Sequence, residues 1–151
     1  MQRWIVLGVV ALVLALGGAG LGFRAYKNSR PHPIWVPMPV NPELTGEKRD
    51  EVAKDLKAKL TAPEKLTQVC KELNLAQEWE LGSDAAAADE LKRRLFVTSG
   101  EMVGKMGMIP SINVGVSGKV KEKIMSEKIA MRLMEDVWDV LGISPPTRKG
   151  P

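Results

Sequence analysis

Few residues of this chain have the type and spacing that catalysis requires. His32 is the only histidine and Cys70 the only cysteine, and they lie far apart in the sequence. A reactive thiol needs a neighbouring base or cation that lowers its pKa, and a metal site needs several ligands. We therefore expect His32 to be a solvated loop residue between two prolines, and Cys70 to be a buried structural thiol on a helix.

The stretch Gly100–Met106 superficially resembles a phosphate-binding loop. The spacing is one residue short of that motif, and Met106 stands where a hydroxyl would hold magnesium. The many carboxylates lie beside cations on predicted helix faces, which gives no acid–base pair. We predict a protein that is not an enzyme and that has no catalytic, cofactor-binding or metal-binding residues.

The longest apolar element runs from Trp4 to Phe23 without a charged residue. A helix of that length rises roughly 30 Å, which matches the hydrocarbon thickness of a bilayer. Aromatic rings and cations favour the two interfaces of such a helix. The sequence therefore predicts a transmembrane anchor in contact with the lipid bilayer. Its predicted interface anchors are Trp4, Arg24, Tyr26 and Lys27.

Small residues recur along one face of this predicted helix at steps of three and four. Close backbone approach at small residues favours association of helices in lipid. This face predicts a homo-oligomer; the alternative is that Gly and Ala are simply common in membrane helices. The residues of the face are Gly8, Ala11, Ala15, Gly18 and Gly22.

A cleaved signal peptide is the alternative to a retained anchor. Cleavage near Gly18–Gly20 would release the rest of the chain, although the apolar run is longer than a usual signal sequence. The cations that follow the helix favour a cytoplasmic domain. The short N-terminal tail that carries Arg3 favours the opposite orientation.

Charge is concentrated near the N-terminus. Of the 22 Lys and Arg residues, Arg3, Arg24, Lys27 and Arg30 precede residue 31, and the other 18 balance the 18 Asp and Glu. A nucleic-acid-binding domain would have a cationic excess of its own, so we predict no nucleic-acid partner. The cations beside the predicted anchor suit contact with anionic lipid if they are cytoplasmic.

The rest of the chain predicts an α+β domain. Strands are expected at 34–40, 95–98 and 111–117, and helices from about 42 to 60, 62 to 74, 84 to 95 and 120 to 141. Prolines at alternate positions of 34–40 indicate an edge strand. The expected architecture is a transmembrane helix followed by a small three-stranded sheet packed with about four helices. The predicted regions are an anchor and connector (1–30), a domain (31–143) and a flexible tail (144–151).

Several finer expectations follow from the periodicity. Thr61 to Glu64 has the spacing of a capping box, residues 99–110 are expected to form a loop, and Gly118 to turn the chain. The last helix is expected to bury one apolar face and to expose its charged residues. The apolar face is Ile124, Met125, Ile129, Leu133, Met134, Val137 and Leu141, and the exposed charges include Glu127, Lys128, Arg132, Glu135 and Asp136.

Four stretches together resemble the membrane-proximal domain of bacterial chain-length determinant proteins, the polysaccharide co-polymerases. They are Leu66–Leu75, Leu91–Val97, Ser111–Val116 and Ser126–Leu133, within a resemblance that covers about 110 residues. Met131 departs from the Asn that is common in the family. The family's second transmembrane helix and its long helical extension have no counterpart here, so the chain is expected to be a reduced form.

The resemblance implies a non-enzymatic scaffold of surface polysaccharide biosynthesis or export. It implies a single-pass protein of the inner membrane with a periplasmic domain, a homo-oligomer, and polysaccharide export or polymerase membrane proteins as partners. The alternative is a small periplasmic or secreted binding domain with a cleaved signal peptide, unrelated to polysaccharide.

Overall fold

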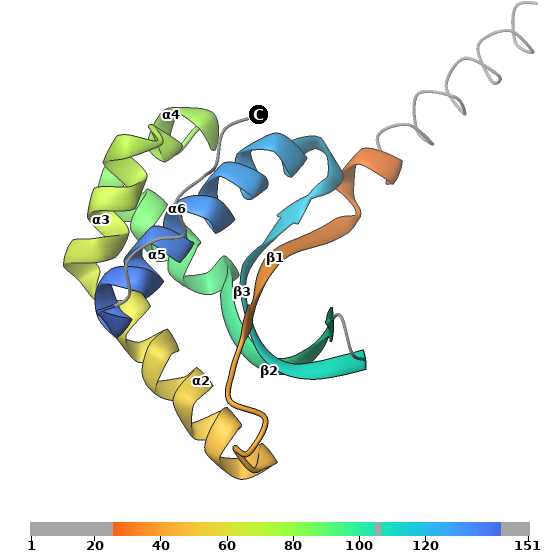
Figure 1. Ribbon diagram of the computed structural model, residues 1–151. Coiled ribbons are helices and arrows are strands. Elements are labelled where there is room, and N and C mark those ends of the chain that lie inside the picture. The colour runs from red at the N-terminus through yellow and green to blue at the C-terminus, as the bar shows by residue number, and fades with distance from the viewer. Residues whose placement is uncertain (1–25, 105–106, 143–151) are drawn as a thin grey trace, which may run out of the picture.

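The computed structural model describes residues 26–104 and 107–142. They form an α+β fold with a three-stranded antiparallel sheet, as the sequence predicts (Figure 1). The element order is β1 (Pro31–Pro39), α2 (Gly46–Leu60), α3 (Pro63–Glu72), α4 (Leu75–Glu78), α5 (Asp84–Arg94), β2 (Leu95–Gly104), β3 (Gly107–Lys119), the 3-10 helix η1 (Val120–Glu122) and α6 (Lys123–Leu141).

The predicted transmembrane segment at 4–23 lies outside the described residues, and so do the self-association face, Trp4, Arg24 and the predicted tail. Within the part of the chain that the structure describes, no helix is long and apolar enough to cross a membrane.

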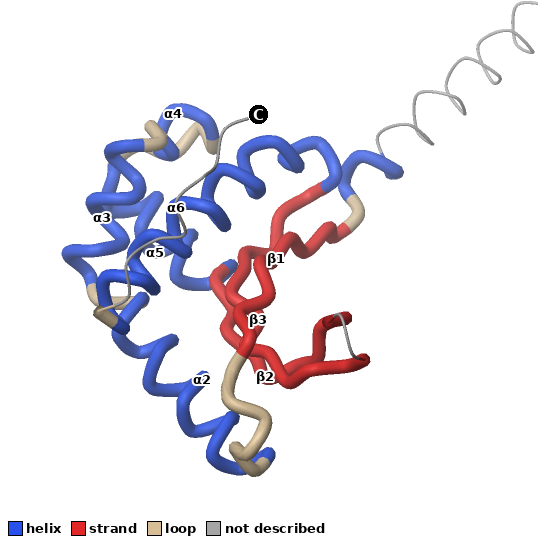
Figure 2. Tube along the Cα trace, viewed as in Figure 1, coloured by secondary structure: helices blue, strands red, loops and turns tan. Residues whose placement is uncertain are grey.

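Strand β3 is the centre of the sheet, with β1 on one side and β2 on the other (Figure 2). Its even-numbered side chains Ile112, Val114 and Val116 are fully buried. Helix α6 packs on β3 and β1, and α2 packs on β2, so the helices cover one face of the sheet. The predicted strand 111–117 is confirmed as the middle of β3, and this strand supplies the centre of the core.

Strand β1 is an edge strand, as its prolines predict. The Val40 amide donates to the Pro110 carbonyl at 3.1 Å, and the Arg30 carbonyl accepts from the Val120 amide at 3.1 Å. Even-numbered residues of β1 therefore direct their backbone groups toward β3. Successive residues of a strand direct these groups to opposite sides. The odd-numbered prolines consequently lie with their missing N–H groups on the free edge.

The predicted loop is wrong at residues 99–104 and 107–110, and residues 105–106 lie outside the described residues. Here β2 and β3 continue as a two-stranded ribbon, with Gly104 opposite Gly107. Strand β1 ends where Pro39 faces Ser111, so the ribbon extends beyond the third strand. Neither face of the ribbon is deeply buried, so apolar and polar residues do not alternate strictly along it. Its Gly and Met residues further obscure the strand pattern. Gly118 is likewise inside β3 rather than at a turn.

Polar side chains and a glycine cap two of the helices. The Ser83 hydroxyl accepts from the Ala86 amide at 3.2 Å at the start of α5, and Gly142 ends α6 in the left-handed conformation. The predicted Thr61 cap is wrong, because α3 begins one residue later with Ala62 at its N-cap. The Thr61 hydroxyl instead donates to the Lys57 carbonyl at 2.8 Å and closes the end of α2.

Both predicted faces of α6 need correction. Ile129, Leu133, Met134 and Val137 are buried as expected, but Ile124 is 72% exposed and Leu141 is 42% exposed. At 3.6 residues per turn, Ile124 lies on the side of the helix opposite the buried Ser126–Ile129–Leu133 stripe. Asp136, predicted to be exposed, is buried at 5%.

Candidate membrane-proximal surface

The single histidine and the single cysteine have structural environments. His32 is half-buried in β1 opposite Gly118, so the expected solvated loop is wrong. Cys70 is buried in α3, as predicted, and burial followed by the charge of Asp84 raises its pKa to about 11. Among residues 26–104 and 107–142, no group of three or more His, Cys, Asp or Glu residues is placed to hold a metal ion.

The domain begins directly after Arg30. Strand β1 starts at Pro31, and the backbone hydrogen bond from Val120 to Arg30 fixes this point against η1. Tyr26 and Lys27, two of the four predicted interface anchors, lie just before it and are exposed. The Arg30 guanidinium lies 4.9 Å from the centre of the Tyr26 ring. The predicted anchor thus leads into a fixed edge of the sheet.

Three lysines gather at this same end because β3 ends beside the start of β1. Lys119 is the last residue of β3, Lys121 lies in η1 and Lys123 begins α6, and all three are exposed. We call Lys27, Arg30, Lys119, Lys121, Lys123 and the exposed Ile124 the basic end of the domain. The contribution of the lysines was not predicted, because they join the N-terminal cations through the pairing of β1 with β3, which is distant in sequence.

The acid in this segment points inward. Glu122 accepts from the Lys119 amide at 3.0 Å and from the Arg94 guanidinium at 2.7 Å. Arg94 also donates to Glu90 at 2.6 Å and stacks over the Trp79 ring at 4.5 Å. The Glu122 side chain is only 16% exposed, so its charge is satisfied within the domain. The lysines on either side of it remain directed to solvent.

The pKa values in this cluster indicate a structural ion pair rather than an acid–base site. Burial alone would lower the pKa of Arg94, but its hydrogen bonds to Glu90 and Glu122 raise it above the ordinary value. The hydrogen bond from Arg94 holds the pKa of Glu90 below its ordinary value. Both groups stay charged at neutral pH, and neither is suited to proton transfer.

Two shallow cavities flank the basic end. One of about 290 Å³ is lined by Ser29, Pro31, Glu90, Arg94, Ser117, Gly118 and Lys119. The other, of about 350 Å³, is lined by Glu78, Trp79, Lys121, Glu122, Ile124, Met125 and Lys128.

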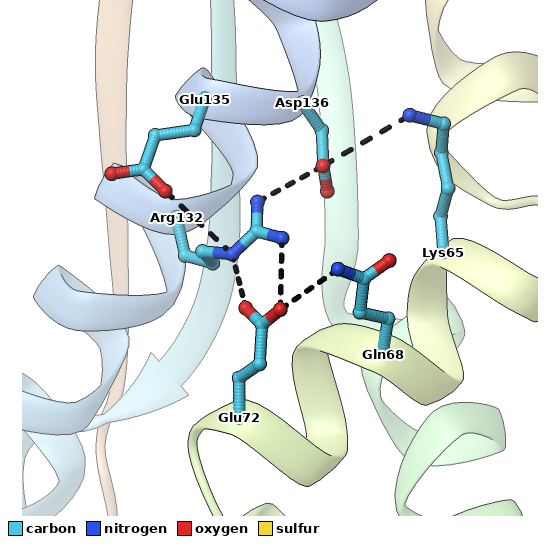
Figure 3. A network of polar contacts seen from close by, with 6 residues as sticks. All are labelled: Lys65, Gln68, Glu72, Arg132, Glu135 and Asp136. Carbon is cyan, nitrogen blue, oxygen red and sulfur yellow. Dashed lines mark hydrogen bonds and ion pairs between the residues drawn. The ribbon is translucent and has the colours of Figure 1, made fainter.

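A second polar network joins α3 to α6 on another side of the domain (Figure 3). Arg132 donates to Glu72 and, at 2.9 Å, to Asp136, whose carboxylate also lies 3.9 Å from the Lys65 ammonium. Arg132 and Asp136, both predicted to be exposed, have side chains that are only 17% and 8% exposed. The prediction of exposure was wrong because it was based on the charge of these residues and not on their position around the helix. This network holds two helices together and adds no reactive group.

No protein-family model, no curated protein and no solved structure shows significant similarity to the chain. The resemblance to chain-length determinants therefore stays a prediction.

Proposed function

We propose that the protein is a membrane-anchored, non-enzymatic assembly protein of surface polysaccharide biosynthesis or export, as its resemblance to chain-length determinants implies. In this proposal it is a single-pass protein of the inner membrane with its domain in the periplasm. It forms a homo-oligomer and works beside polysaccharide export or polymerase membrane proteins.

One observation carries the proposal: the domain begins at the residue where the predicted anchor region ends. Only residues 24–30 separate the predicted span from β1, and Arg30 is already bonded to Val120. A junction this short leaves the domain close to the bilayer. Association of the predicted spans through their small-residue face would therefore also fix how neighbouring domains face one another.

Two further features support a scaffold. The resemblance implies an edge strand, then helices, a strand pair and a long helix, and the described elements follow the same order. The carboxylates of Glu72 and Glu90, whose pKa is lowered, are held by arginines in ion pairs. The Glu72 pair joins α3 to α6, and Arg94 joins Glu90 of its own helix to Glu122 of η1.

The retained anchor is tested on membranes of cells that express the full chain. We expect the protein to stay in the pellet after an alkaline carbonate wash, to keep Met1 by intact mass, and to run as an oligomer in detergent. Release by the wash, or a monomer that starts near Leu21, would contradict the proposal and favour a cleaved signal peptide.

The small-residue face is tested by Gly18→Leu combined with Gly22→Leu. We expect the oligomer to dissociate, because larger side chains prevent close approach of the helices. The matched control is Gly17→Leu with Gly20→Leu, which changes the same residue type off that face. Equal effects of the two pairs would show that the face has no special role.

The polysaccharide role is tested by deleting the gene in its source organism. We expect the length distribution or the amount of surface polysaccharide to change, and the wild-type gene to restore it. The Gly18→Leu/Gly22→Leu variant should fail to restore it while the control pair succeeds. If the surface polysaccharide were unchanged after deletion, the proposed role in polysaccharide biosynthesis or export would be contradicted.

A further inference from the structure

The basic end presents cations and an apolar side chain on one surface. The bond between Val120 and Arg30 brings Lys119, Lys121 and Lys123 to the end of the domain that carries Lys27 and Arg30. Helix α6 runs away from this end across the sheet, as Figure 1 shows. The cations therefore lie at the end of the domain where the chain enters it.

We propose that the basic end binds the anionic phospholipid headgroups of the membrane that holds the anchor. This inference rests on the retained anchor of the proposed function, and it requires anionic lipid in the leaflet that faces the domain, whichever side of the membrane that is. Cations beside a membrane helix are attracted to anionic lipid over about a Debye length, roughly 8–10 Å. The short junction at 24–30 keeps these lysines near the bilayer.

The charge balance of the surface favours an anionic partner. Glu122 is turned toward Arg94 and does not neutralise the lysines. Glu127 lies 3.8 Å from Lys123, but both side chains are at least half-exposed, and exposed pairs are weak. The surface consequently keeps a net positive charge, although the chain beyond residue 30 carries equal numbers of cations and acids.

Exposed apolar groups add a second reason. Ile124 is 72% exposed and Tyr26 is 60% exposed, and each lies beside a cation of the basic end. Apolar side chains among cations are typical of protein surfaces that rest in the headgroup region of a bilayer. Tyrosine favours the same depth because its ring is apolar and its hydroxyl polar. A phospholipid surface can contact the cations through its headgroups and the exposed apolar side chains through its acyl region.

The test places a polarity-sensitive fluorophore at Ile124→Cys in the full chain, reconstituted in phosphatidylcholine vesicles with or without phosphatidylglycerol. Native Cys70 is buried, so the unsubstituted chain is the labelling control. Met131→Cys is the matched position: it lies on the same face of α6, about 10 Å farther along, and is 50% exposed. Quenching by lipids with a spin-labelled chain reports contact with the bilayer.

We expect strong quenching at position 124 in vesicles that contain phosphatidylglycerol, and little at position 131. Lys121→Glu with Lys123→Glu should reduce the quenching at 124 severalfold. Lys54→Glu with Lys57→Glu, an equal change of charge on exposed residues of α2, should leave it unchanged. Equal quenching at 124 with and without phosphatidylglycerol, or no effect of the Lys121 and Lys123 changes, would overturn the inference.

Flotation of the same vesicles in high salt separates this inference from the proposed function. A chain that does not float lacks a retained anchor, which overturns the proposed function and this inference with it. A chain that floats but shows no quenching at 124 keeps its anchor and overturns the lipid contact alone.

Discussion

Arg132 on α6 donates two hydrogen bonds to Glu72 on α3, from Nε to Oε2 at 2.5 Å and from Nη2 to Oε1 at 3.4 Å. The two residues are 60 positions apart in the chain. The same guanidinium also donates to the buried Asp136, so one side chain satisfies acids on both helices (Figure 3). This arrangement makes Arg132 the central residue of the α3–α6 contact.

We predict that Arg132→Met destabilises the fold by about 2 kcal/mol, because the buried Asp136 carboxylate loses its closest cation. Lys65, at 3.9 Å, remains as a weak replacement. Denaturant unfolding of the full chain in detergent, followed by tryptophan fluorescence, measures the change. The double variant Arg132→Met/Asp136→Leu should recover part of the loss, since it removes the unpaired charge.

The matched control is Lys59→Ala, which breaks an exposed pair with Asp55. Its effect should stay below about 0.5 kcal/mol. If Arg132→Met were as mild as this control, the α3–α6 network would not contribute to stability.

Gly115 lies where β1 and β3 approach closely, between Trp35 on one neighbouring strand and Phe96 on the other. A Cβ at this position would lie 2.6 Å from the Trp35 Cβ and would also collide with the Ile34 carbonyl. We predict that Gly115→Ala costs about 2 kcal/mol, because backbone must move to relieve the overlap. Gly82→Ala, with nothing within 4 Å of the new methyl, should be close to neutral in the same unfolding assay.

The sequence predicted the fold to the extent that periodicity and proline chemistry determine it. The alternation at 111–117 and the prolines of β1 were enough to identify a central strand and an edge strand. The ribbon formed by residues 99–104 and 107–110 was missed because Gly100 and Gly104 are poor strand formers, and only pairing to β3 makes this segment a strand.

The candidate site was less predictable than the fold. Tyr26 and Lys27 were identified from their position beside the apolar run, whereas Lys119 and Lys121 join them through a contact distant in sequence. The burial of Asp136 could have been predicted, because this residue lies seven positions after the buried Ile129 and therefore on nearly the same side of α6. Charge alone was a poor guide to exposure at that position.

Acid should weaken the fold through Glu72 and Glu90. The hydrogen bond from Arg132, with that from Gln68, lowers the pKa of Glu72, and the hydrogen bond from Arg94 lowers that of Glu90. Their contribution is complete above the ordinary value of 4.5 and is lost as the pH falls through the lower folded values. We expect the free energy of unfolding to decline below pH 4.5, with a shallower decline in Glu72→Gln/Glu90→Gln. Identical pH profiles for the two proteins would contradict this assignment.

Cys70 should resist thiol reagents in the folded protein. Burial raises its pKa to about 11, so little thiolate exists at pH 8 and the reagent has no access. We predict a reaction more than roughly a hundredfold slower than in denaturant, because modification must await an opening of the fold. Val103→Cys gives an internal comparison, since residue 103 is 79% exposed. Equal rates at positions 70 and 103 would mean that α3 does not cover the thiol.

The prolines of β1 should protect the free edge of the sheet from pairing with another chain. Pro31, Pro33, Pro37 and Pro39 share the outward parity, so Trp35 is the residue of β1 that can offer an N–H there. We predict that Pro33→Thr with Pro37→Thr restores two donors to the free edge and promotes strand-to-strand association. Size analysis in detergent should show larger species as protein concentration rises. Pro63→Ala, which removes a proline from the start of α3 instead, should leave the size distribution unchanged. If the β1 variant kept the wild-type size distribution at every concentration, the prolines would not be what prevents strand pairing at this edge. Any oligomer would then have to form without a contribution from the free edge of β1, for example through the predicted membrane helices.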